Sequence, residues 1–247
     1  MRIALFGTGN LATHFLNVFE KLETISCVQW IGRHKNPPTT NTTPYFNSFQ
    51  NEIEVDICIL AISDDHIVEV AQSFNTDALV VHTAAARSLD ELAPHKRRGV
   101  LYPLQSFLKE LNINWENIPI CLESNNEDDL CILEKLAQKL SNEVHIVNTK
   151  QRLHLHTAAV FANNFCNHLL GISQNIITEI GLPHDLLHPI IKETLSRSLN
   201  SNARKQQSGP AKRNDINTQS KHIDILTADQ ATLYSVLSKS IYKTHKK

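Results

Sequence analysis

Two glycines and an alanine near the N-terminus have the spacing of a phosphate-binding turn. They form the pattern Gly7-x-Gly9-x-x-Ala12, between an apolar run at 3–6 and a periodic stretch that predicts a helix. In the dinucleotide fingerprint, the glycines permit a tight turn and admit a pyrophosphate, which binds the N–H groups of the helix start. The alternative is an ordinary strand–helix turn. The fingerprint predicts cofactor contacts from five consecutive residues, Gly7, Thr8, Gly9, Asn10 and Leu11.

A basic cluster follows the second predicted strand, at 25–31. Arg33, His34 and Lys35 stand where NAD-selective dinucleotide folds carry an acid that accepts a hydrogen bond from the ribose 2′-hydroxyl. A guanidinium and an ammonium instead suit a 2′-phosphate. The cluster therefore predicts NADP as the cofactor, with NAD as the second choice. A solvated basic turn is the other interpretation.

Two further buried-strand runs end in small and hydroxyl residues. Ala61 and Ser63 close the first run, and His82 and Thr83 follow the second. Ligands of doubly wound sheets bind outside the carboxyl ends of the strands. We therefore expect Ala61 and Ser63 to contact the ribose or pyrophosphate, and His82 and Thr83 to lie beside the nicotinamide. Helix capping by Ser63 explains the first of these turns equally well.

A histidine and two asparagines lie on the long helix predicted over 150–181. His156, Asn163 and Asn164 are separated by seven and eight residues, two helical turns, so they share approximately one face. An imidazole can shuttle the proton that hydride transfer requires, and an amide can bind the substrate oxygen. These residues are the candidate catalytic set. Structural hydrogen bonds between domains are the alternative.

A second polar set follows a later polar loop. Asp215, Thr218 and His222 have i, i+3, i+7 spacing on one helix face, and Arg213 precedes them. Arg213 can clamp a substrate carboxylate, so Arg213 and Asp215 are candidate substrate-binding residues. In the alternative, Asp215 caps its helix and Arg213 is solvated. The loop belongs either to its own cleft or to that of a partner subunit.

The elements that position these residues form two blocks. Seven predicted strands interleave with helices up to residue 150, and 36–50 is a Pro-, Thr- and Asn-rich loop. Helical periodicity alone follows, interrupted by a polar loop at 203–214. The pattern predicts an α/β fold with an N-terminal Rossmann-type doubly wound sheet and an all-α C-terminal domain. We place the NADP-binding domain at 1–150 and a substrate and dimerisation domain at 151–247.

Composition narrows the class of protein. The net charge of −1 over 247 residues argues against a nucleic-acid partner. No apolar run approaches the roughly 20 residues of a membrane span, so no membrane partner is expected. The five cysteines are scattered in apolar stretches without a C-x-x-C pair, which predicts small buried side chains and no metal site. These features predict a cytoplasmic protein.

Six motifs occur in order along the chain: GTGNLA, ISDD, VVHTAAARSLD, YPLQSF, HTAAVFANNF and SGPAKRND. With them, nearly the whole chain resembles the bacterial "Rossmann-like and DUF2520 domain-containing" family, akin to deazaflavin-dependent NADP reductases and ketopantoate reductase. The resemblance implies an oxidoreductase-like protein whose C-terminal domain, of the 6-phosphogluconate dehydrogenase type, usually dimerises. The family's loop typically reads Gly-Pro-x-x-Arg-Gly-Asp, whereas this chain has Asn214 for the second glycine. Asn tolerates a left-handed backbone, so the turn can survive.

Taken together, the features predict an NADP-dependent reductase or dehydrogenase of a small carbonyl, imine or hydroxy-acid substrate. A homodimer through the C-terminal helices is expected. Related enzymes often place a lysine on the face of His156, and Lys150 lies a turn and a half too early for that. This departure favours the alternative, a non-catalytic nucleotide-binding or sensing protein that retains the cofactor cleft.

Overall fold

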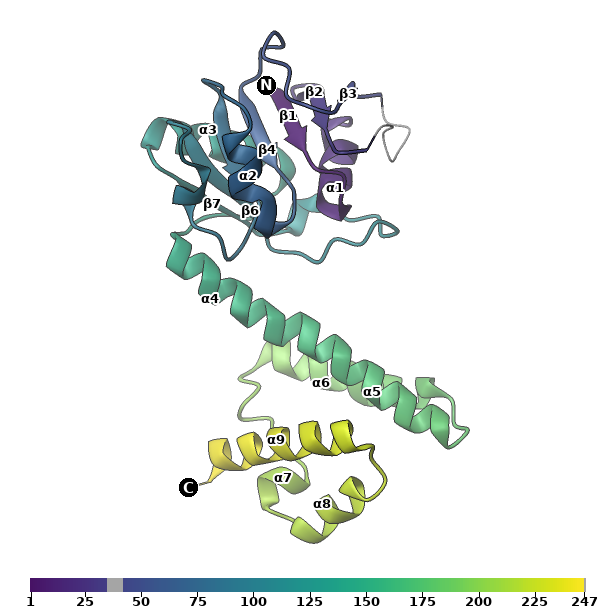
Figure 1. The fold of residues 1–247 in the computed structure, drawn as a ribbon. Helices are drawn as coiled ribbons and strands as arrows, with labels where there is room; N and C mark the ends of the chain where they lie inside the picture. The colour runs from purple at the N-terminus through teal and green to yellow at the C-terminus, as the bar shows by residue number, and fades with distance from the viewer. Residues whose placement is uncertain (35–41, 247) are drawn as a thin grey trace. The chain divides into compact units, whose positions relative to one another are not determined.

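The computed structural model describes residues 1–34 and 42–246. The chain divides into two compact units, Met1–Ala162 and Asn163–Lys247 (Figure 1). The first unit contains the sheet, and the described part of the second contains helices alone. The predicted class, an α/β Rossmann-type domain followed by an all-helical part, is confirmed. Helix α4 (Thr149–Ala159), where the second domain is predicted to begin, belongs to the first unit.

The first unit is built on an eight-stranded sheet in the order β3-β2-β1-β4-β5-β6-β7-β8. Neighbouring strands are parallel except β6 and β7, which are antiparallel. The strand order reverses between β1 and β4, the point at which doubly wound sheets open a crevice for ligands. The strands are β1 (Arg2–Phe6), β2 (Ser26–Ile31), β3 (Tyr45–Phe46), β4 (Ile57–Leu60), β5 (Leu79–His82), β6 (Arg98–Pro103), β7 (Ile120–Ser124) and β8 (Val144–Ile146).

The central strands are apolar along their whole length because both faces of the sheet are covered. Strands β4 and β5 are buried at every position. Such continuous burial is typical of parallel strands between two helical layers. One face packs on a cluster that includes Phe15 and Leu133, and the other on a cluster that includes Ile67 and Phe74. The two-residue strand β3 lies in the stretch 36–50 that the sequence predicts as a loop.

Besides α4, the described part of the first unit contains the α-helices α1 (Asn10–Phe19), α2 (Ile67–Gln72) and α3 (Glu127–Leu140). Two of the four, α3 and α4, begin at side-chain caps. Asn126 caps α3 by accepting a hydrogen bond from the Asp129 amide, and Asn148 forms a capping box with Gln151 at the start of α4. Helix α4 therefore starts at a fixed point directly after β8.

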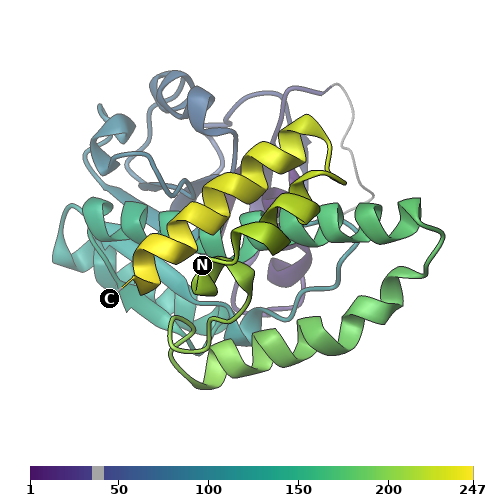
Figure 2. The same ribbon diagram turned by 90° about the horizontal axis from the view of Figure 1, so that it is seen from below.

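The second unit contains five helices in its described part. They are α5 (Cys166–Glu179), α6 (His188–Asn200), α7 (Pro210–Arg213), α8 (Ile216–Ile223) and α9 (Ala228–His245). Helix α7 packs against α9 (Figures 1 and 2). The sequence predicts a polar loop over 203–214, but α7 occupies the end of this stretch. Pro210 suits the first position of a helix, and the polar composition around it does not indicate this short helix. Among the described residues of this unit, Ala211 and Ser238 alone are buried.

The predicted burial of the cysteines can be compared with the structure. Cys58 and Cys121 are buried as predicted, but Cys131 and Cys166 are exposed, so the prediction of buried cysteines is wrong for these two. Within residues 1–34 and 42–246, no cluster of three or more histidine, cysteine or acidic side chains is placed to hold a metal ion. In the same ranges, no helix combines the length and apolarity needed to cross a membrane.

Candidate functional site

A cleft of about 830 Å³ opens at the carboxyl ends of β1, β2, β4 and β5. It lies where the strand order reverses, the expected position of a ligand crevice. Its lining brings together nearly all of the residues predicted to hold a cofactor: Gly7, Thr8, Gly9, Asn10, Leu11, Arg33, His34, Ala61, Ser63 and Thr83. Lys35, the third member of the predicted basic cluster, lies outside the described residues.

Gly7 forms the tight turn between β1 and α1. Its φ of +117° suits glycine, and a Cβ there would lie 2.1 Å from the Ala61 carbonyl oxygen. The Gly7 amide donates to the Ile31 carbonyl over 2.9 Å. The Trp30 indole Nε1–H donates to the Gly7 carbonyl over 2.7 Å. The hydrogen bond from Trp30 to Gly7 could not be predicted from the sequence, in which Trp30 has only the features of a buried strand residue.

Gly9 stands at the N-terminus of α1 and faces open space. Its φ of −79° is accessible to any residue, and a Cβ at this position would meet no atom within 4 Å. The first turn of α1 carries no acidic residue. The N–H groups of a first helical turn lack intrahelical acceptors and carry a partial positive charge. The cleft thus presents an anion-binding surface at Gly9.

The β2 side of the cleft is basic. Arg33 and His34 are exposed and line it, and the Tyr45 hydroxyl donates to the His34 carbonyl over 3.1 Å. Among the described residues that line the cleft, Glu69 is the one carboxylate. An acid that recognises a ribose 2′-hydroxyl would stand directly after β2. The described residues at this position, 32–34, include no acid.

The turn after β4 lines the middle of the cleft. Ser63 stands at the N-cap position before a 3₁₀ turn, but its hydroxyl bonds to Nδ1 of His66 (2.8 Å) instead of a backbone amide. Ser63 and His66 both line the cleft. Ser63 therefore lines the cleft, and its side chain does not cap the turn as the alternative interpretation expects.

His82 ends β5 and Thr83 follows it, and the two residues have different surroundings. Thr83 lines the cleft, whereas His82 is fully buried and does not. His82 Nδ1 accepts from the Ala84 amide (3.2 Å), so the neutral ring carries its proton on Nε2, for which no hydrogen-bond partner lies within range. Burial and, next, the charge of Arg152 lower the pKa of His82 to about 4. His82 is thus a neutral support beneath the segment that carries Thr83.

His156 on α4 is hydrogen-bonded to a residue that the sequence does not single out. Its Nδ1 lies 3.1 Å from the hydroxyl of Tyr102, at the end of β6. Burial, followed by Cys121, raises the pKa of Tyr102 to about 12, against the opposing effect of Arg152. The phenol therefore keeps its proton. When it donates to Nδ1, the imidazole carries its own proton on Nε2, away from the pair.

The two candidate asparagines lie on the other side of the unit division. Asn163 and Asn164 begin the second unit, whereas His156 belongs to the first, which ends at Ala162. A π-helical segment, Val160–Phe165, stands between α4 and α5. The prediction of a shared face uses the α-helical period, and that period does not apply across a π-helical turn. Such turns are frequent at functional sites.

The Arg213 and Asp215 stretch forms a well-defined turn. Asn214 is left-handed (φ +57°), the Asp215 amide donates to the Pro210 carbonyl and the Asn214 amide to the Ala211 carbonyl. These bonds make a Schellman motif that ends α7, as expected for an asparagine in place of glycine. Asp215 then caps α8.

The capping carboxylate of Asp215 accepts from the Thr218 amide (3.1 Å) and hydroxyl (2.8 Å). These bonds are the main cause of the lowered pKa of Asp215, and Arg213 and His222 add to it. The capping interpretation of Asp215 therefore describes what its side chain does in the structure.

Comparison with known proteins places the chain in context. A family model described as "Domain of unknown function (DUF2520)" matches residues 118–241. A provisionally named NADP oxidoreductase from Bacteroides fragilis shares 29% sequence identity with a TM-score of 0.86, over 98% of each chain. A protein from Thermotoga maritima shares 23% identity with a TM-score of 0.78, over 99% of this chain and 100% of the other. No match was found among curated proteins.

The fold extends to more distant enzymes. Pyrroline carboxylate reductase from Plasmodium falciparum, solved with NADP bound, shares 13% identity with a TM-score of 0.60, over 100% of this chain and 98% of the other. That likeness concerns the fold alone. The family model covers half of the sequence and spans both units, from β7 to α9. The chain therefore belongs to the DUF2520 family.

Proposed function

We propose that this protein is an NADP-dependent oxidoreductase that reduces a small carbonyl or imine or oxidises a small hydroxy acid. The observation that carries the proposal is the cleft, which combines a glycine turn, an open helix N-terminus and a basic end. The 29%-identical Bacteroides fragilis protein, itself provisionally named an NADP oxidoreductase, supports the same cofactor.

The described residues fit NADP from end to end of the cleft. The open space at Gly9 would hold the pyrophosphate against the start of α1. Arg33 and His34 would hold the 2′-phosphate, for which a planar guanidinium offers two parallel hydrogen bonds. Thr83 lies at the β5 end, opposite Arg33 in the strand order, and would border the nicotinamide.

The substrate side is assigned to His156. When bound, the nicotinamide supplies or takes up a hydride. The chain must then give a proton to the substrate oxygen or nitrogen, or remove one in the oxidative direction. In the reductive direction the imidazolium form of His156 gives its Nε2 proton to the substrate, and in the oxidative direction the neutral ring takes a proton up at Nε2. In both forms Nδ1–H donates to the Tyr102 oxygen, which fixes the ring. Asn163, Asn164, Arg213 and Asp215 remain the candidate residues for binding the substrate.

The first test is calorimetric titration with NADPH and NADH, followed by NADPH oxidation with small 2-oxo acids, aldehydes and cyclic imines. We expect NADPH to bind more tightly than NADH and at least one substrate class to be reduced. Failure to bind either nucleotide contradicts the proposal. Tight NADPH binding without turnover of any class supports the nucleotide-sensing alternative instead.

His156→Ala should lower the rate with such a substrate roughly 100-fold, because removing a general acid typically costs this much. The affinity for NADPH should not change, since His156 does not line the cleft. His154→Ala is the matched control, because His154 lies on the same helix and bonds only to its own turn at the Lys150 carbonyl. Equal rates in the two variants would remove His156 from the chemistry.

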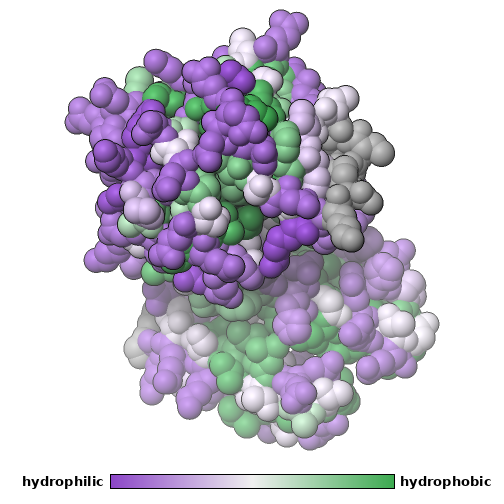
Figure 3. Space-filling model, turned by 45° about the horizontal axis from the view of Figure 1, so that its top comes forward, coloured by the Kyte–Doolittle hydropathy of each residue, from purple (hydrophilic) through white to green (hydrophobic). Residues whose placement is uncertain are grey.

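The protein is further proposed to be a homodimer through its second unit. Few residues of that unit are buried, and it exposes large apolar side chains, among them Leu182, Ile190, Leu199, Ile225 and Val236. Figure 3 shows apolar residues gathered on its surface. Helices that bury so little apolar area are not stable alone, and a second copy presenting the same side chains would cover them.

Sedimentation equilibrium tests the dimer. We expect the mass of two chains at micromolar concentration. Ile190→Glu together with Leu199→Glu should shift the protein to monomers, because charges would then enter an apolar interface. The control is Leu108→Glu with Leu111→Glu, since these two leucines are also exposed but belong to the first unit. This control should leave the dimer intact. A wild-type mass of one chain would contradict the proposal.

A further inference from the structure

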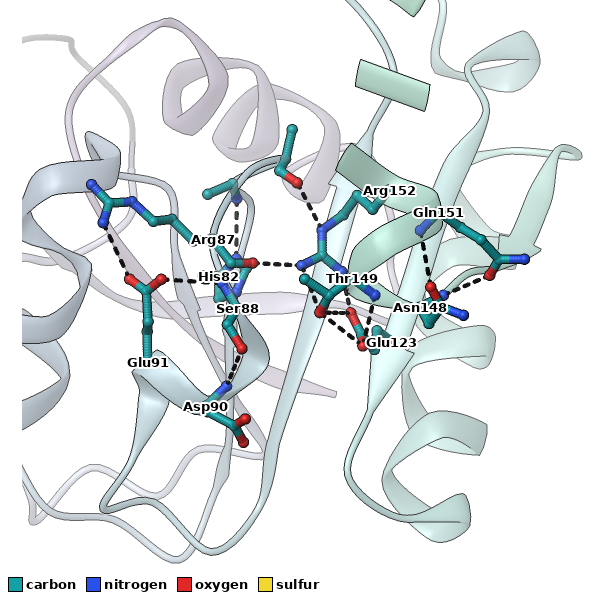
Figure 4. Close-up of polar contacts among 12 residues, drawn as sticks. His82, Arg87, Ser88, Asp90, Glu91, Glu123, Asn148, Thr149, Gln151 and Arg152 are labelled. Carbon is teal, nitrogen blue, oxygen red and sulfur yellow. Dashed lines mark hydrogen bonds and ion pairs between the residues drawn. The ribbon is translucent and has the colours of Figure 1, made fainter. Parts of the chain in front are cut away.

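A buried arginine lies at the start of α4, next to the nucleotide-binding sheet. Arg152 is 0% exposed, and its Nη1 forms an ion pair with the Glu123 carboxylate on β7. Glu123 also accepts from the amide and the hydroxyl of Thr149, each over 3.0 Å (Figure 4). The first turn of α4 is thus fixed to β7 by an arginine, a glutamate and a threonine.

The remaining donors of the guanidinium point to a different segment. Nε donates to the Ala85 carbonyl (3.2 Å) and Nη2 to the Arg87 carbonyl (2.6 Å). Both carbonyls belong to the segment 84–88, which directly follows the cleft-lining Thr83 at the end of β5. Figure 4 shows Arg152 between this segment on one side and Glu123 with Thr149 on the other. One side chain therefore holds the backbone that follows Thr83.

The same segment is also connected outward to the cleft. The Arg87 side chain pairs with Asp65 (2.5 Å) and with Glu91 (3.4 Å). Asp65 belongs to the turn whose residues Ser63 and His66 line the cleft. Asp65 is largely exposed, so this outer pair contributes little by itself. Arg152 is the buried and more rigid of the two attachments.

Stability alone does not explain a buried charge at this place. Desolvating an ion pair costs about as much as the pair returns, so an apolar side chain of similar volume would stabilise the fold comparably. A guanidinium offers something else, since its N–H donors lie in one plane and hold several acceptors in fixed relative positions. Here the acceptors are two carbonyls of one loop and a carboxylate of a neighbouring strand.

We propose that Arg152 is a positioning residue for the nicotinamide end of the bound cofactor. It holds the backbone after Thr83 at the β5 end of the cleft, and so sets the position of the reactive ring without touching it. This inference rests on the proposed function, because it assumes that NADPH extends from Arg33 to Thr83. None of the contacts described for the guanidinium of Arg152 involves Arg33, which lies at the β2 end of the cleft.

Two ligands separate the two ends of the cleft. NADPH occupies both, whereas adenosine 2′,5′-bisphosphate carries only the adenosine and phosphate groups that the Gly9 and Arg33 side would bind. Arg152→Met combined with Glu123→Gln removes the guanidinium without leaving a buried unpaired carboxylate. We expect this double variant to bind NADPH roughly tenfold more weakly, as coupling through a packed network allows, and to bind the bisphosphate as the wild type does.

Arg97→Met is the matched control, because Arg97 also pairs with an acid, the buried Asp129 (2.5 Å), but precedes β6 at the amino end of that strand, away from the carboxyl ends that border the cleft. It should lower the melting temperature and leave both affinities unchanged. If the double variant does not fold, Arg152→Lys serves instead, since lysine keeps the charge but cannot hold both carbonyls. It should show the same selective loss, in smaller degree.

The outcomes distinguish this inference from the proposed function. Wild-type protein that binds neither NADPH nor the bisphosphate overturns the proposed function and this inference with it. Wild-type protein that binds NADPH, with variants that lose both ligands equally or neither, overturns the role of Arg152 alone. A selective loss of NADPH affinity supports it.

Discussion

Gly9→Val should abolish NADPH binding and leave the protein folded. The Gly9 backbone is in the extended region that β-branched residues prefer, and a Cβ there would meet no protein atom. The added isopropyl group would occupy the space that a pyrophosphate needs in order to reach the N–H groups of α1. We expect a loss of affinity of at least about 100-fold, since the pyrophosphate contacts are the anchor of the dinucleotide fingerprint.

The neighbouring glycine provides the contrast. Gly7→Ala should destabilise the fold itself. Its φ of +117° disfavours any side chain, and the added Cβ would lie only 2.1 Å from the Ala61 carbonyl oxygen. Calorimetric titration and thermal unfolding of both variants form the experiment. Undiminished NADPH affinity in Gly9→Val would remove the phosphates from the start of α1. A melting temperature of Gly7→Ala equal to that of the wild type would contradict the described turn.

Arg33→Asp should reverse the preference between the two nicotinamide cofactors. A hydrogen bond from a charged group contributes about 2 kcal/mol, which corresponds to roughly 30-fold in affinity for NADPH. The introduced carboxylate also repels the 2′-phosphate, and it can accept from the 2′-hydroxyl of NADH instead. We therefore expect NADPH affinity to fall by at least this factor, while NADH affinity is maintained or increases.

The control is Lys135→Asp, which makes the same change in net charge at an exposed position on α3, outside the cleft. Titrations with both nucleotides at low and high salt distinguish a local contact from general charge repulsion, since the latter is screened. An equal loss of NADPH and NADH affinity in Arg33→Asp would assign Arg33 to another part of the cofactor or to the fold.

The sequence predicts which residues gather in the cleft because that gathering depends on local patterns. The turn from Gly7 to Ala12, the bases after β2 and the residues ending β4 and β5 each occupy a short stretch, and parallel strands bring their ends to one edge. His82 is the exception, since alternation along β5 places it under the cleft and Thr83 in it.

Contacts between distant parts of the chain were not predictable in this way. Tyr102 and His156 are 54 residues apart, and the Arg152 guanidinium reaches a carbonyl 67 residues earlier. Arg152 occupies a helix whose composition suggests an exposed position, and only the fold shows that its guanidinium is buried and bonded to Ala85, Arg87 and Glu123. The π-helical segment at Val160–Phe165 has no compositional signal either, and the shared face predicted for His156 and Asn163 depended on its absence.

The left-handed Asn214 at the end of α7 bears on how relatives of this protein can be recognised. What the turn demands is a residue that accepts φ near +57°, followed by an aspartate that caps the next helix. Glycine adopts this left-handed conformation at the lowest free-energy cost, and asparagine and aspartate can adopt it too. A search pattern that insists on glycine between the arginine and the aspartate would pass over this chain. A pattern written in terms of backbone conformation would retain it and others that have made the same exchange.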